Sequence, residues 1–124
     1  MIIMSWQYSQ TTGQLTRDGK LVATGYAGKG AGKNNPKVEH LRDTGPLPRG
    51  RYRIGRPYEH SKLGPHVMNL QPIGHAAHGR TAFRIHGEST SRPGAASDGC
   101  IILSPRNIRQ QISASGDNEL IVVE

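Results

Sequence analysis

The chain contains one cysteine, and it lies fourteen residues after a histidine in the stretch RIHGESTSRPGAASDGC. A free thiol is a weak nucleophile at neutral pH, because only a few per cent of it is thiolate. An imidazole beside the sulfur accepts its proton, stabilises the thiolate as an ion pair and later returns a proton to a leaving amine. The pattern predicts Cys100 as a nucleophile and His86 as general base and acid.

The residues just before the cysteine are suited to binding a negatively charged oxygen. Gly99 has no side chain to block a substrate carbonyl and permits unusual backbone angles. We expect the N–H groups of Asp98, Gly99 and Cys100 to converge on a developing oxyanion, where losing one donor costs about 10²–10³ in rate. Ser97 is expected to hydrogen-bond across this loop. Residues 97–100 are therefore the predicted oxyanion-binding loop.

Short strands must position these groups, because 16 glycines and 8 prolines in 124 residues favour strands and turns over long helices. In TAFRIHG, Phe83 and Ile85 alternate with Arg84 and His86, which indicates a strand with two different faces. Gly87 then lets the chain turn away. The following loop returns Cys100 to the mouth of the neighbouring strand, CIIL.

The other strand candidates follow the same alternation. Trp6 and Tyr8 alternate with polar residues, and Asp18-Gly19 predicts a two-residue hairpin within a small sheet over residues 1–26. The segments RYRIG, HVMNLQPI and ELIVV complete the expected sheet. VEHLR is expected to form one helical turn. PRNIRQQIS is expected to be a short helix, with Ser104 as its N-cap, Pro105 at its first position, and Ile108 and Ile112 on one face.

The glycine-rich segment 27–33 does not have the spacing of a phosphate-binding loop. A loop of that class needs a glycine six residues before its lysine and a hydroxyl after it, but this chain has Ala27 and Asn34 at those positions. We interpret the segment as a flexible loop beside the sheet. Together with residues 87–96 it is expected to border the substrate groove.

Length and composition predict one domain, residues 1–124, with anionic partners. The formal charge is +7, and a single cysteine forms no internal disulfide. The apolar start Met1–Met4 is shorter than the apolar region of a secretory signal, and no run is long enough to span a bilayer. We expect a monomer made in the cytoplasm without a signal peptide and without membrane insertion.

The motif HG…SDGCIIL resembles the L,D-transpeptidase motif, in which His-Gly is followed by Ser/Thr-x-Gly-Cys. The segments MSWQYSQTTGQL, GYAGKGAGKNNP, TGPLPRGRYRIG and FRIHGES…PGAASDGCII are more similar to the type VI secretion L,D-transpeptidase effectors, over nearly the whole chain. The resemblance implies a mainly β fold, a compact L,D-transpeptidase-like sandwich or barrel with one or two short helices.

The same resemblance implies an activity on peptidoglycan stem peptides, with no cofactor. Cys100 attacks the carbonyl of the third residue, meso-diaminopimelate, and releases the terminal D-alanine from a thioester. Water then gives a shortened stem, which is L,D-carboxypeptidase activity, whereas a free D-amino acid gives an exchanged stem. The two outcomes remain open. The resemblance also implies secretion into a target cell's periplasm and a cognate immunity protein in the producer.

Two positions depart from the housekeeping motif. Asp98 replaces its second histidine, and Ile102 replaces an arginine two residues after the cysteine. The missing contact to a substrate carboxylate is expected from Arg84, Arg92 or Arg106, with Gly87 beside the substrate.

Four alternatives compete with this interpretation. A lone cysteine is often a core residue. His75 and His78, with His86 and Cys100, make a weak metal-site pattern, because paired ligand motifs are absent. The basic charge also fits a non-enzymatic module that binds anionic glycan or nucleic acid, although interleaved aromatic residues are missing. A cysteine hydrolase acting on another amide is the fourth. Reactivity of the thiol and release of D-alanine discriminate among them.

Overall fold

The computed structural model describes residues 5–124, and Met1–Met4, on which the expectation about an export signal depends, lie outside the described residues. The strands are β1 (Trp6–Ser9), β2 (Gln14–Arg17), β3 (Lys20–Thr24), β4 (Tyr26–Ala27), β5 (Gly50–Ile54), β6 (Tyr58–His60), β7 (Gly64–Ile73), β8 (Phe83–His86), β9 (Ile101–Ile102) and β10 (Glu119–Val123). The helices are α1 (Arg106–Ala114) and the 3₁₀ turns η1 (Gly30–Gly32), η2 (Pro36–Val38) and η3 (Ala77–Gly79). Within residues 5–124, no helix has the length and apolar character needed to cross a membrane.

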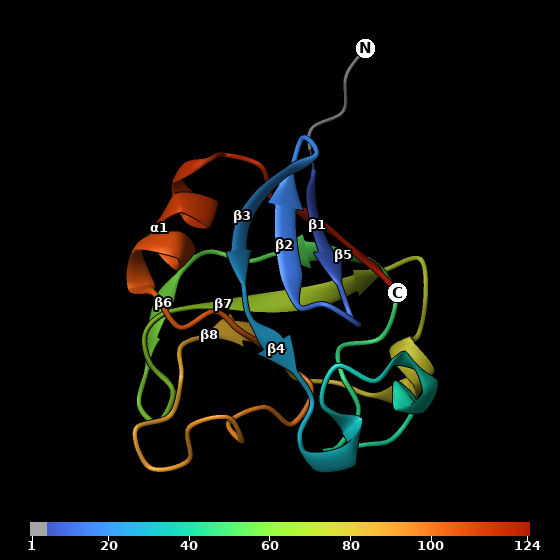
Figure 1. Cartoon of the computed structure of the whole chain (residues 1–124). Coiled ribbons are helices and arrows are strands. Elements are labelled where there is room, and N and C mark those ends of the chain that lie inside the picture. The colour runs from blue at the N-terminus through green and yellow to red at the C-terminus, as the bar shows by residue number, and fades with distance from the viewer. Residues whose placement is uncertain (1–4) are drawn as a thin grey trace.

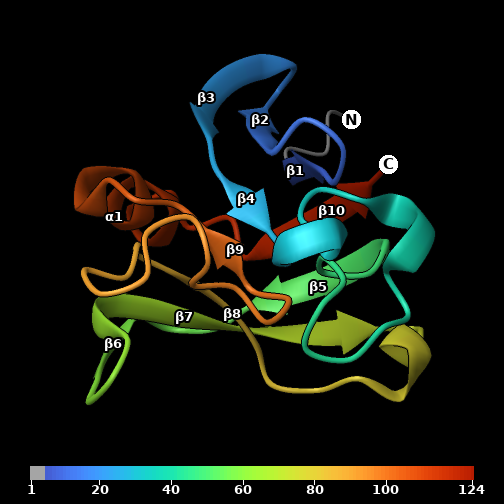
Figure 2. The ribbon, with the colours of Figure 1, turned by 60° about the horizontal axis from the view of Figure 1, so that its bottom comes forward.

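The strands form one curled sheet in the order β3-β2-β1-β10-β5-β7-β8-β9-β4, with β6 paired to β7. The two ends of this order, β3 and β4, are neighbours in sequence, separated only by Gly25 (Figures 1 and 2). A Cβ at Gly25 would lie 2.0 Å from the carbonyl oxygen of Ile102, so only glycine fits where the sheet closes. The fold is therefore mainly β and nearly a barrel, as the sequence predicts.

Alternating apolar residues from these strands fill the interior. Trp6 and Tyr8 on β1 are fully buried, as expected from their spacing. Phe83 and Ile85 point into the same core from β8. Helix α1 packs beside β7 and buries Ile112 in the same core. One continuous core thus supports the central strands β7 and β8, and with them the end of β8 where the predicted base lies.

The predicted hairpin is confirmed, and two helix predictions need correction. Asp18 and Gly19 have φ of 54° and 75° between β2 and β3, as a primed two-residue turn requires. Helix α1 begins at Arg106, so Pro105 is its N-cap and Ser104 lies outside it. Proline lacks the N–H that a capped first turn must satisfy, and no side chain caps this end. The expected turn at VEHLR lies earlier, at η2, where the Asn35 side chain accepts from the Lys37 N–H.

The glycine-rich segment 27–33 packs closely against another backbone segment, whereas the sequence predicted a loop that merely lies beside the sheet. It begins in β4 and continues into η1. A Cβ at Gly32 would lie 2.1 Å from the carbonyl oxygen of Thr44, and the Lys29 N–H donates to that same oxygen. The glycines therefore allow two backbone segments to touch, which places Gly28 and Lys29 beside the loop that carries the cysteine.

A buried carboxylate fastens the segment after η2 to the sheet. Glu39 is 8% exposed and accepts from Gln10 Nε2 at 2.9 Å, Arg49 Nε at 2.9 Å and His78 Nε2 at 2.8 Å. Burial raises the pKa of Glu39, but these hydrogen bonds outweigh it and lower the pKa to about 2. The carboxylate is thus charged in the folded protein over the whole range in which unfolded glutamate titrates.

Replacing Glu39 by glutamine is expected to lower the free energy of unfolding by about 2–3 kcal/mol at pH 7. Since the folded pKa lies below the unfolded value of 4.5, this contribution is complete above pH 4.5 and is lost as pH falls toward 2. Urea unfolding at neutral and acidic pH measures it, with Glu59→Gln on the exposed strand β6 as the control. A Glu39→Gln deficit that stayed constant down to pH 2 would contradict the assignment.

Candidate active site

Strands β8 and β9 bring His86 and Cys100 to one side of the sheet. The strands are parallel, with Ile85 opposite Ile101 and His86 opposite Ile102. Because side chains alternate along a strand, Cys100, one residue before Ile101, faces the same side as His86. Both residues line one cavity of about 240 Å³. Its other lining residues come from four separate loops and from β8: Asp43, Leu63, Thr81, Ala82, Phe83, Arg84, Arg92, Ala96 and Asp98.

The imidazole of His86 is held in the tautomer that a general base needs. Its Nδ1 donates to the carbonyl oxygen of Gly87 at 2.8 Å, which leaves Nε2 without a proton in the neutral ring. Burial lowers the pKa of His86, the Gly87 carbonyl opposes that shift, and the charges of Arg109 and Arg84 lower the pKa further. The ring is therefore neutral and able to accept a proton at neutral pH.

The thiol of Cys100 is 8% exposed and opens onto the cavity. Its Sγ lies 3.9 Å from the carbonyl oxygen of Ala82. Burial raises the pKa of Cys100, and a hydrogen bond from the Arg84 backbone N–H opposes this. Both His86 and Cys100 are described residues, and no hydrogen bond joins Sγ to the imidazole. The directions of the two pKa shifts therefore favour a resting pair of thiol and neutral imidazole.

Ser97 fixes the shape of the loop before the cysteine. Its Oγ accepts from the N–H of Gly28 at 2.8 Å and of Gly99 at 3.1 Å, and it donates to the carbonyl oxygen of Cys100. The Gly99 N–H is consequently directed at Ser97 and not at a substrate. This corrects the expectation for the Gly99 N–H, which was expected to converge on an oxyanion with the N–H groups of Asp98 and Cys100.

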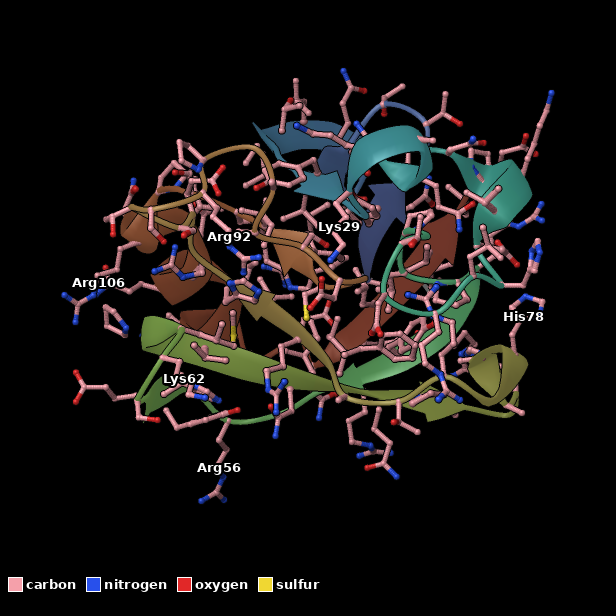
Figure 3. The ribbon with its side chains drawn as sticks, turned by 90° about the horizontal axis from the view of Figure 1, so that it is seen from below. Lys29, Arg56, Lys62, His78, Arg92 and Arg106 are labelled. Atoms are coloured by element: carbon pink, nitrogen blue, oxygen red, sulfur yellow. The ribbon has the colours of Figure 1, made fainter. Side chains whose placement is uncertain are left out.

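The cations proposed for carboxylate binding lie at different distances from the thiol cavity. Arg84 and Arg92 line it, and neither belongs to an ion pair among the described residues. Asp98 also lines it, and its carboxylate binds Lys29 Nζ at 2.8 Å. In Figure 3, Arg92 and Lys29 lie toward the middle of the face, whereas Arg106 points outward at its edge. The structure therefore brings Arg84 and Arg92, but not Arg106, to the cavity.

A second hollow of about 780 Å³ continues the cavity past His86. It shares His86 and Arg92 with the thiol cavity and is bordered by Gly87 and the following loop, as expected, and by Lys62. Residues 27–33, which were expected to border the groove as well, line neither hollow. Side chains of β4 and of the glycine-rich segment hydrogen-bond to the loop that follows Gly87. Tyr26 Oη donates to Glu88 at 2.7 Å and accepts from the Ala96 N–H at 3.2 Å, while Lys33 Nζ donates to the Gly94 carbonyl at 3.1 Å. An extended groove thus runs beside the imidazole.

Comparison with known families decides where this chain belongs. The family model described as the Tlde1 domain matches residues 22–123, most of the chain. The chain belongs to the Tlde1 domain family. This confirms the resemblance to type VI secretion effectors with an L,D-transpeptidase-like domain. No curated protein matches the sequence.

Solved structures show that the Tlde1 domain has the fold of L,D-transpeptidase catalytic domains. The catalytic domain of the E. faecium L,D-transpeptidase is 17% identical, with a TM-score of 0.56 over 99% of this chain and 98% of that domain. Bd1075 of Bdellovibrio bacteriovorus is 13% identical, with a TM-score of 0.64 over 97% of this chain and 47% of that one. The helical cell shape determining protein Pgp2 from Campylobacter jejuni is 15% identical, with a TM-score of 0.60 over 98% and 48%. The chain spans about half the length of the latter two proteins.

The two histidines weighed as metal ligands have other partners in this Tlde1 domain. His75 Nε2 lies 3.0 Å from the carbonyl oxygen of Arg51, and His78 pairs with Glu39. Figure 3 places His78 at the edge of the face, away from Lys29 and Arg92. Both histidines thus contribute to the structure around β5 and η3.

Two buried arginines near the site escape sequence analysis. Arg80 and Arg109 are 5% and 4% exposed, and the hydrogen bonds of both guanidinium groups end on backbone carbonyls. Arg80 reaches the loop of Cys100, and Arg109 lowers the pKa of His86. Every residue has a backbone carbonyl, so no residue type in the sequence identifies these partners. From the sequence alone, Arg80 and Arg109 therefore cannot be distinguished from arginines on the surface.

Proposed function

We propose that this Tlde1 domain cleaves peptidoglycan stem peptides between meso-diaminopimelate and D-alanine through a thioester on Cys100. The observation that carries the proposal is the shared cavity of His86 and Cys100, with an unprotonated Nε2, in a fold of L,D-transpeptidases. Membership of the Tlde1 domain family supports the substrate class.

The reaction follows from the resting protonation states. As Sγ bonds to the carbonyl carbon, its proton passes to His86 Nε2, and the carbonyl oxygen becomes an oxyanion. The Cys100 N–H is the donor that we assign to this oxyanion, since the Gly99 N–H is bound to Ser97. The imidazolium then protonates the nitrogen of D-alanine as the C–N bond breaks. Water or the amine of a free D-amino acid next attacks the thioester and returns the thiol.

Recognition of the stem is assigned to cations beside the thiol. Stem peptides carry carboxylates on diaminopimelate and on the terminal alanine, and Arg84 and Arg92 line the cavity without a carboxylate partner among residues 5–124. A guanidinium group matches a carboxylate with two parallel hydrogen bonds. We assign the carboxylates to Arg84 and Arg92, with the loop 87–96 along the groove.

The biological role that we propose is that of an antibacterial type VI secretion effector. Its family supports delivery into a competitor, and its substrate lies in the target cell's periplasm. A cognate immunity protein then protects the producing cells.

Incubation with a purified stem tetrapeptide is expected to release D-alanine and leave the tripeptide, as measured by mass spectrometry. Added D-methionine separates the two fates of the thioester, because exchange replaces the terminal alanine by methionine, whereas hydrolysis gives tripeptide alone. Binding to peptidoglycan without release of D-alanine would contradict the proposal and favour a basic binding module.

A further inference from the structure

Arg80, just before β8, is connected to both sides of the loop that carries the thiol. Its Nη1 donates to the carbonyl oxygens of Glu39 and Pro46, the latter at 2.9 Å. Its Nη2 donates to Gly45 O at 3.1 Å and to Asp98 O at 3.1 Å. The guanidinium also lies 5.5 Å from the centre of the Phe83 ring. One buried side chain therefore joins the segment 39–46 to the peptide that precedes Gly99.

Gly99 is shaped to accept this guanidinium. A Cβ at Gly99 would lie 2.4 Å from Arg80 Nη2, and the residue has a φ of 131° that side chains rarely allow. From the sequence, the missing side chain at Gly99 was expected to leave room for a substrate carbonyl. In the structure, the guanidinium of Arg80 lies where the Cβ of a larger residue would be.

The backbone of the nucleophile loop is held from two sides. Arg80 binds the Asp98 carbonyl, while Ser97 binds the Gly99 N–H and the Cys100 carbonyl. These three hydrogen bonds fix the peptides on either side of Gly99. Both anchors are buried, so solvent cannot replace either one at low cost.

We propose that Arg80 is a positioning residue for the nucleophile, holding the Asp98–Cys100 backbone so that the thiol and the Cys100 N–H face the substrate cavity. The inference rests on the proposed role of Cys100. Lysine at this position keeps the charge but cannot donate to four carbonyls spread around a planar fork. Misplacing a reacting group by about 1 Å costs on the order of 100-fold in rate.

Arg80 also supplies positive charge near the sulfur. Around the thiol, the charged and titratable groups are Arg80, Arg84 and Asp98, with Asp43, His86 and Arg92 on the cavity wall. Burial raises the pKa of Cys100, and Arg80 is one of the groups that lower it. Loss of the guanidinium charge therefore moves thiolate formation to higher pH.

Alkylation of the single cysteine by iodoacetamide tests the inference without a peptidoglycan substrate. Arg80→Lys is expected to slow alkylation at pH 7 about tenfold, and Arg80→Met is expected to shift its pH midpoint upward as well. On the stem tetrapeptide, Arg80→Lys is expected to lower kcat about 10–100-fold and change KM less than about threefold.

Arg109→Lys is the matched control, because Arg109 is equally buried and also binds four backbone carbonyls, those of Pro65, His66, Leu103 and Ser104. Lysine at this position retains the positive charge that lowers the pKa of His86. It is expected to lower Tm as much as Arg80→Lys while alkylation stays within about twofold of wild type. If the two variants alkylate at the same rate, Arg80 has only a structural role and the inference is wrong.

Gly99→Ala provides a second approach should Arg80→Lys not fold, because it pushes the guanidinium away while Arg80 remains. Wild-type alkylation by folded Gly99→Ala overturns the inference, since the displaced guanidinium then has no effect on the thiol. Should wild type fail to release D-alanine while Arg80→Lys still alkylates slowly, the proposed function fails but the positioning role of Arg80 stands.

Discussion

Replacing Cys100 by alanine is expected to abolish the release of D-alanine, with a loss of at least about 10⁴-fold in kcat. No other thiol is present in the chain, and the thioester needs a nucleophile that alanine lacks. Mass spectrometry of the tripeptide product measures the rate, and wild type should in addition show a mass increase on brief incubation with substrate, from the acylated thiol.

Cys100→Ser is the matched control for the shape of the site. Oxygen replaces sulfur with little change in size, but a serine hydroxyl is a far weaker nucleophile unless a base activates it strongly. Both variants should keep a Tm close to wild type, since the side chain borders a cavity rather than the packed core. D-Alanine release by folded Cys100→Ala at a tenth of the wild-type rate would exclude Cys100 as nucleophile.

The sequence predicts the strands of this fold well because they follow local rules. Trp6 and Tyr8 alternate with polar residues, and the Asp18-Gly19 turn allows positive φ at both positions. The order of the strands does not follow from such rules. The pairing of β9 with β4 depends on the closure at Gly25, where contacts join residues about 75 positions apart in sequence.

Sequence analysis could select candidate site residues where their chemistry and spacing distinguish them. Cys100 is the single thiol, and His86 is an imidazole near it in sequence that could accept its proton; their common cavity is consistent with that choice. The tautomer of His86, the inward N–H of Gly99 and the carbonyl partners of Arg80 depend on backbone geometry, which residue identity does not encode. Arg106 was a candidate only by charge, and it lies on the first turn of α1, at the edge of the face in Figure 3.

Replacing His86 by glutamine is expected to lower kcat/KM by about 10²–10⁴-fold and to remove the acid limb of its pH profile. In wild type this limb reports protonation of the base. Because burial lowers the pKa of His86, the imidazole stays neutral to a pH below its ordinary 6.5, and the limb should lie below that value. Rates of D-alanine release across the pH range measure both effects.

The alkaline side of the same profile separates two mechanisms. With a resting thiol and neutral imidazole, kcat/KM remains level through pH 8, because the imidazole is already neutral and burial raises the pKa of the Cys100 thiol, so that neither group loses a proton in this range. A preformed thiolate–imidazolium pair would instead lose activity as the imidazolium loses its proton. Burial raises the pKa of Cys100 and lowers that of His86, and both directions oppose the ion pair.

His66→Gln is the matched control for the imidazole. Burial also lowers the pKa of His66, but this ring is bound to the Ser113 hydroxyl at 2.7 Å, on the α1 side of β7. Its replacement should leave the acid limb in place. An acid limb that persisted in His86→Gln and vanished in His66→Gln would show that His86 is not the base. A wild-type profile that fell between pH 7 and 8 would show that the resting pair is a thiolate and an imidazolium.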